Sequence, residues 1–119
     1  MNEGMIERAR ELGRMLGQSE EYKALGRARQ RLDDDREAVE AVNKLAQLEG
    51  EIGAALRAGQ EPSVEAQQAY EASFGTLQGS AAYQGLVAAQ TNFDKLLQKV
   101  NEEIGKGIET GAQSRIILS

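Results

Sequence analysis

The chain has 119 residues, of which 40% are apolar and only 4% aromatic, and its formal net charge is −5. It contains neither Cys nor His, which excludes thiolate and imidazole metal sites and every Ser-His or Cys-His nucleophile. The length suits one domain whose core is made of small aliphatic side chains between helices. Because no stretch has the apolar length of a membrane span or a signal peptide, we expect a cytoplasmic protein.

Apolar residues recur at helical spacing, which predicts an all-α, elongated four-helix protein with two long helices packed side by side and two shorter helices. The first helix covers Asn2 to Leu16 and ends at Gly17, which suits the left-handed conformation that follows many helices. The second runs from its N-cap Ser19 to about Leu56. At roughly 57 Å it exceeds a compact monomer, so it either bends or is covered by a second copy.

Glycines and the single proline mark the remaining boundaries. We expect any bend of the second helix near Gly50 and Gly53, because each interior glycine destabilises a helix by roughly 1 kcal/mol. A third helix begins at Pro62 or Ser63 and reaches Leu77. The fourth is capped by Ser80 and ends near Glu109. Residues 1–111 then form a single helical domain, and residues 112–119 a flexible tail whose apolar residues are loosely docked or disordered.

The apolar faces of the two long helices form a predicted seam for packing and dimerisation, so we expect self-association as a homodimer or higher oligomer. Asp35 falls on this seam, three residues after Leu32 and four before Val39. A polar residue there needs a partner, and it either fixes the pairing register or makes a functional contact. The seam comprises Leu25, Leu32, Asp35, Val39, Val42, Phe93, Leu97, Val100 and Ile104.

Two charged groups are candidate binding sites. Five acidic residues lie between Asp33 and Glu40, but they lack the ligand spacing of a calcium loop, so a solvated helix face is favoured over a metal site. Lys23, Arg27 and Arg31 form an i, i+4, i+8 ridge that could contact RNA or an acidic partner. The alternative is a solvated face with acidic neighbours. Only Tyr22 is available for base stacking, and the overall acidity opposes dedicated nucleic-acid binding.

A pattern spread over most of the chain resembles the YlbF/YmcA family of small helical bacterial proteins, including its YheA-like branch. It consists of Leu12-Gly13-x-x-Leu16-x-x-Ser19-x-Glu21-Tyr22-x-x-Leu25, Asp35-x-x-Ala38, Pro62 and Ala89-x-x-x-Phe93-x-x-Leu96-Leu97-x-x-Val100-x-x-x-Ile104. The resemblance spans about residues 5 to 109. It implies a self-associating helical protein without catalytic activity. Better-studied members join each other and a third protein in a complex that influences endoribonuclease Y-dependent RNA processing, competence, sporulation and biofilm formation.

The resemblance carries no catalytic residues to this chain. The iron–sulfur property of relatives with cysteines in a C-terminal extension does not transfer either, because those cysteines are missing here. We therefore expect a non-catalytic adaptor or regulator without cofactor or metal, whose partners are itself and another protein of a regulatory complex, with no membrane. The alternative is a direct RNA-binding module that uses the basic ridge. A secreted helical hairpin of the WXG type is disfavoured by the missing Trp-x-Gly turn and by the number of helices.

Overall fold

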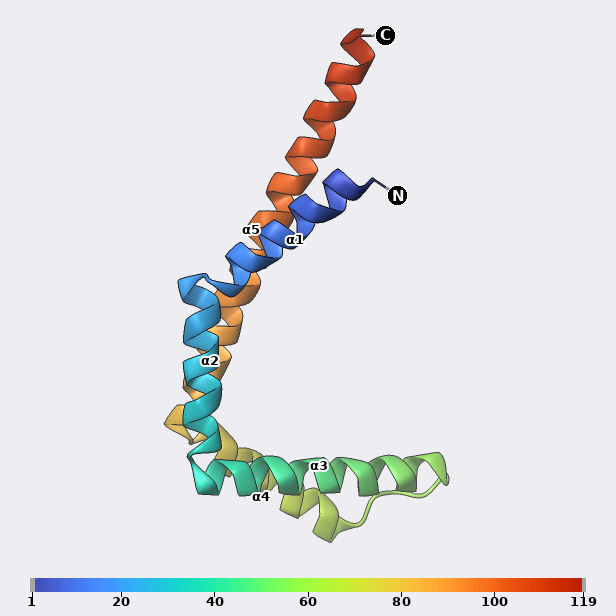
Figure 1. The fold of residues 1–119 in the computed structure, drawn as a ribbon. Helices are drawn as coiled ribbons and strands as arrows, with labels where there is room; N and C mark the ends of the chain where they lie inside the picture. Colours follow the sequence, from blue (N-terminus) through green and yellow to red (C-terminus); the bar gives the residue numbers. More distant parts are fainter. Residues whose placement is uncertain (1, 119) are drawn as a thin grey trace.

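The computed structural model describes residues 2–118, with the side chains of residues 2–113. Within that range the chain is all-helical and elongated, as predicted: its radius of gyration is 21.7 Å, against about 13.5 Å for a compact domain of this length. None of the described helices is long and apolar enough to cross a membrane. The five helices (Figure 1) are α1 (Glu3–Gly17), α2 (Glu20–Asp33), α3 (Arg36–Arg57), α4 (Val64–Gln78) and α5 (Ala81–Leu118).

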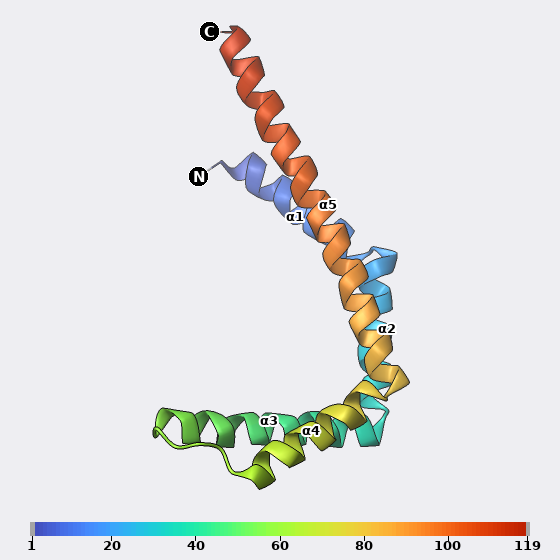
Figure 2. The same cartoon turned by 180° about the vertical axis from the view of Figure 1, so that it is seen from behind.

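Two antiparallel helix pairs meet at a corner. In one pair α2 packs along the first half of α5, and in the other α3 packs along α4. Tyr22 contacts Phe93, with ring centroids 5.3 Å apart in an edge-on arrangement, whereas Leu32 and Tyr83 both pack at the other end of the pair, against the α3–α4 core. Figures 1 and 2 show the α3/α4 pair extending to one side of this corner, with α1 and the end of α5 beyond α2 at the far end of the molecule.

The predicted single helix from Ser19 to Leu56 is wrong, because the chain breaks at Asp34 and Asp35. Asp35 has extended backbone angles, φ −94° and ψ 96°, and its carboxylate accepts a hydrogen bond from the Ala38 N–H at 3.2 Å. Aspartate side chains compete with helical backbone bonds in this way and therefore favour N-cap positions. Two helices consequently replace one, which gives five helices where four were expected.

Glycine positions also differ from expectation. The helix α3 continues through Gly50 and Gly53, so these residues do not interrupt it; its buried face, including Leu45 and Leu48, stabilises it by packing. Gly17 is the last residue of α1 and is not left-handed, because Ser19 closes that helix end by donating its hydroxyl to the Leu16 carbonyl at 2.7 Å. Among the described residues, only Gly59 has a positive φ, 73°, and it follows α3.

The predicted serine caps Ser19 and Ser80 are confirmed, and Ser63 caps α4 in the same way. Ser19, Ser63 and Ser80 each accept a hydrogen bond from the backbone N–H three residues later. The expected end of the last helix near Glu109 is wrong, since α5 continues to Leu118; none of its glycines forces a left-handed turn, and no proline follows Ala81. The domain limits of 1–111 and the flexible tail stay predictions, and the side chains of Ile116, Ile117 and Leu118 lie outside the described residues.

The core consists of two small clusters rather than one. Alanines lie at both helix contacts, which lets the backbones approach closely, and each buried leucine contributes about 1.5–3 kcal/mol. The cluster between α3 and α4 comprises Ala38, Ala41, Leu45 and Leu77, with Leu32, Tyr70 and Tyr83 packed against it. The cluster between α2 and α5 comprises Leu25, Ala28 and Ala89, with Leu86 and Phe93 packed against it. The helix α1 has no buried residue.

Candidate interaction surfaces

The corner between the two helix pairs is joined by one side-chain hydrogen bond. The Ser80 hydroxyl donates to Asp35 Oδ2 at 2.9 Å, while the other carboxylate oxygen of Asp35 caps α3. Ser80 in turn caps α5 by accepting from the Tyr83 N–H at 3.2 Å. The caps of two helices, 45 residues apart in sequence, therefore hold one another. Asp35 has the partner that its place on the seam required, although Ser80 was not identified as that partner.

The predicted seam is divided between the two helix pairs. Leu25 is buried against α5 and Leu32 packs near the corner, so both serve contacts within the chain. Val42 and Ile104 are exposed. The remaining members are half-buried, namely Asp35, Val39, Phe93, Leu97 and Val100. Their role in a dimer stays a prediction.

The basic ridge lies on α2 beside a shallow hollow. Lys23 is 3.9 Å from Glu20, an exposed pair of little energetic weight. Arg27 and Arg31 form no ion pair with the described residues, and they flank a hollow of about 290 Å³ between α2 and α5. Its floor is made of alanine and glycine, with Asn92 at one end. The ridge is thus free to contact a partner, but no aromatic residue lines this hollow.

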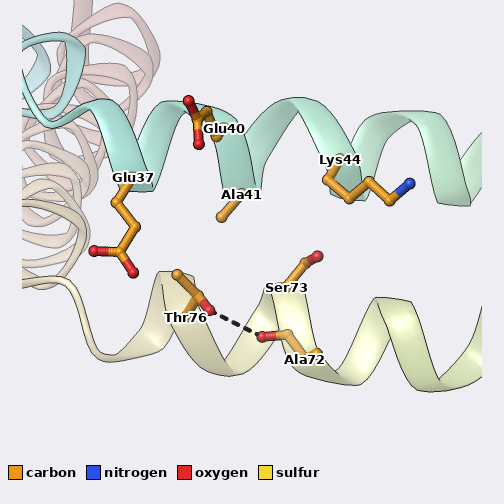
Figure 3. A pocket seen from close by; sticks show the side chains of 7 residues that line it. All are labelled: Glu37, Glu40, Ala41, Lys44, Ala72, Ser73 and Thr76. Atoms are coloured by element: carbon orange, nitrogen blue, oxygen red, sulfur yellow. Dashed lines mark hydrogen bonds between the residues drawn. The ribbon is translucent and has the colours of Figure 1, made fainter.

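The acidic residues from Asp33 to Glu40 diverge around the corner. Among the described residues, no group of three or more Asp and Glu converges as metal ligands would. Glu37 and Glu40 instead border an open groove of about 320 Å³ between α3 and α4, shown in Figure 3. Ala41 points across this groove, while Lys44 lies further along α3. The α4 side is formed by Ala72, Ser73 and Thr76.

The hydroxyl groups of the groove in Figure 3 belong to Ser73 and Thr76. The Thr76 hydroxyl donates to the Ala72 carbonyl at 3.1 Å, an ordinary bond within one helix. Ser73 makes no side-chain hydrogen bond to Glu37, Glu40 or Lys44, which line the same groove. The groove offers polar and charged contacts on the surface of the helix pair.

A third surface lies at the far end of the molecule, and it contains two residues of the predicted seam, Val100 and Ile104, together with residues of α1 that the seam did not include. We call it the distal arm, which consists of α1 and residues 95–113 of α5. Leu12 of α1 and Val100 and Ile104 of α5 line an apolar hollow of about 340 Å³. Met5, Met15 and Ile108 are largely exposed on the same arm. Its apolar residues were evident as helical stripes, but a stripe does not indicate whether it is covered.

Charged side chains border this hollow. Glu103 lies 3.2 Å from Lys99 Nζ and 3.2 Å from Lys106 Nζ. Hydrogen bonding to Lys106, then to Lys99, holds the pKa of the exposed Glu103 carboxyl below its ordinary value. On α1, Glu7 pairs with Arg14 at 2.9 Å. Lys99 and Glu103, the two charged residues that line the hollow, are therefore paired with one another.

The family of the chain follows from comparison with known proteins. A family model described as "Control of competence regulator ComK, YlbF/YmcA" matches residues 5–109. The chain belongs to this family. The match covers α1 from Met5 onward, the whole of α2, α3 and α4, and α5 as far as Glu109. It therefore includes both core clusters and the Asp35–Ser80 corner. No curated protein and no solved structure matches the chain.

Membership confirms the resemblance that the cap, tyrosine and terminal-helix residues indicated. A YlbF/YmcA protein is described by its regulatory role in competence control, not by a catalytic one, and the open, shallow hollows of this chain suit contacts with other macromolecules. The assignment to the YheA-like branch stays a prediction.

Proposed function

We propose that this YlbF/YmcA protein is a cytoplasmic, non-catalytic adaptor that associates with itself and with another protein of a regulatory complex. The observation that supports this most is the open form of the chain: it exposes 9144 Å², whereas a compact monomer of 12.9 kDa exposes about 6,300 Å². Surfaces of this extent are typical of proteins whose partners cover them. The pathway proposed for the complex is endoribonuclease Y-dependent RNA processing, with effects on competence, sporulation or biofilm formation.

The partner surface we propose is the acidic arm, which we define as residues 36–78, comprising α3, α4 and their connection. It holds seven Glu against three basic residues, and its groove is bordered by Glu37 and Glu40. An acidic surface favours a partner with complementary basic residues and accelerates their encounter at low salt. This arm is well separated from the distal arm in Figure 1, so the chain could engage two surfaces at once.

The test is a deletion strain in which transcript ends are mapped, complemented with the wild-type gene or with a Glu37→Lys, Glu40→Lys variant. We expect altered transcript ends in the deletion strain, normal ends when the wild-type gene is restored, and altered ends when the charge-reversed variant is supplied. A matched control is Glu7→Lys, an exposed glutamate outside the acidic arm. Unchanged transcript ends in the deletion strain would contradict the proposed pathway.

Direct RNA binding is the second candidate, and the free guanidinium groups of Arg27 and Arg31 favour it. RNA binding through phosphates would weaken steeply with salt, and Arg27→Glu would weaken it further. Titration of the purified protein into a labelled transcript at several salt concentrations measures both effects. Absence of binding at low salt would exclude this function and leave the adaptor.

A further inference from the structure

We propose that the distal arm is covered by the distal arm of a second copy, packed about a two-fold axis. This inference rests on the self-association proposed above and names the surface that mediates it. It keeps only the last residues of the seam expected from the sequence, Val100 and Ile104, and adds α1. Leu25 and Leu32 of that seam are already occupied within the chain. The surface left for a partner copy lies on the distal side of the contact between Tyr22 of α2 and Phe93 of α5.

The exposed area of the chain is sufficient for a large interface. The excess over a compact monomer is about 2,800 Å², whereas a stable interface of standard size removes about 800 Å² from each partner and permanent dimers remove more. A second copy that covered the distal arm would therefore bring each chain towards the surface that a compact protein of this mass exposes.

The helix α1 is the part that most needs such a partner. It has 15 residues and none of them is buried, although isolated helices of this length are marginal in water. Its apolar residues Met5 and Met15 are 65% and 62% exposed. On the second half of α5, Ile104 and Ile108 are 47% and 67% exposed. Packing against an equivalent pair of helices would bury both stripes together.

The charge balance of the distal arm favours contact with the distal arm of a second copy. Three Glu and three Arg lie in α1, and three Glu and three Lys lie between Lys95 and Glu109, so two distal arms carry no net charge when they face one another. Two acidic arms would instead bring four net negative charges on each side together and repel. Glu7 and Glu103 are already paired within each chain, which lowers the cost of bringing the apolar residues beside them into contact with a second copy.

Light scattering on the purified wild type, Ile108→Glu and Val64→Glu tests this surface. Val64 lies on the acidic arm and is 66% exposed, which matches Ile108 in exposure and in the charge introduced. We expect Ile108→Glu to weaken dimerisation at least about tenfold, since a carboxylate would enter the apolar interface. The wild type and Val64→Glu should remain dimeric at the same concentrations.

Far-UV circular dichroism separates loss of association from loss of folding. If Ile108→Glu loses its helical signal, Met15→Glu replaces it, because this residue lies on α1 and is also largely exposed. A dimeric wild type whose Ile108→Glu and Met15→Glu variants dimerise as tightly as before would overturn the proposed surface while leaving self-association intact. A monomeric wild type would overturn self-association itself.

Discussion

Ser80 donates a hydrogen bond to Asp35 at 2.9 Å, and each of these residues also caps the helix that follows it. This hydrogen bond links the two helix starts at the corner where α2 turns into α3 and α4 turns into α5, and Leu32 and Tyr83 pack across the same corner. The two helix pairs have their main contacts within each pair and few across the corner. The relative placement of the acidic arm and the distal arm therefore depends on this hydrogen bond together with the packing of Leu32 and Tyr83.

Replacing Asp35 with alanine should destabilise the protein. The substitution removes the N-cap of α3 and leaves the half-buried Ser80 hydroxyl without its acceptor, for a combined loss of about 1–3 kcal/mol in the free energy of unfolding. Urea denaturation followed by circular dichroism measures it. Asp34→Ala is the matched control, since Asp34 is exposed and its change should stay within about 0.5 kcal/mol. Equal losses in the two variants would contradict the role assigned to Asp35.

The helix boundary within the acidic run from Asp33 to Asp35 was not predicted from the sequence. Leu32 and Val39 are spaced as they would be on one face of a continuous helix. The apolar periodicity alone therefore predicted no break at the corner. Aspartate is a poor helix former and a strong N-cap. Three consecutive aspartates therefore indicate the boundary between α2 and α3. Ser80 could not be identified as the partner of Asp35, because the contact depends on how two helix pairs meet. The serine caps were predictable since each involves only four adjacent residues.

The distal arm shows a second limit. The apolar stripe of α1 was evident from Met5, Leu12 and Leu16, yet a stripe is the same whether its cover comes from the same chain or from another copy. No residue of α1 is buried, and from this observation we infer that another copy covers the helix.

Two glycines near the end of the acidic arm should respond oppositely to alanine. Gly50→Ala should stabilise the protein by about 0.5–1 kcal/mol, because Gly50 is exposed in the interior of α3 and a β-carbon there would contact nothing within 4 Å. Gly59→Ala should destabilise it by about 1–2 kcal/mol, since its φ of 73° is unfavourable for alanine. Thermal and urea unfolding compare both with the wild type. Destabilisation by Gly50→Ala would indicate that α3 bends there after all.

The Glu103 carboxyl should titrate below its ordinary pKa, and Lys106→Met should raise that pKa by removing the first of its two lysine partners. Because the pKa is lowered in the folded protein, the pair stabilises the fold above the unfolded pKa, and this contribution is lost as the pH falls through the folded pKa. Carboxyl carbon NMR titration of both proteins measures the pKa. An unchanged pKa for Glu103 in the variant would show that Lys106 does not hold it.

Sedimentation equilibrium of the purified wild type across micromolar concentrations tests the central claim, that this YlbF/YmcA chain associates with a second copy. The account predicts a mass of twice 12.9 kDa that falls towards the monomer only on dilution. A mass of 12.9 kDa at every concentration, with the helical signal intact, would contradict it.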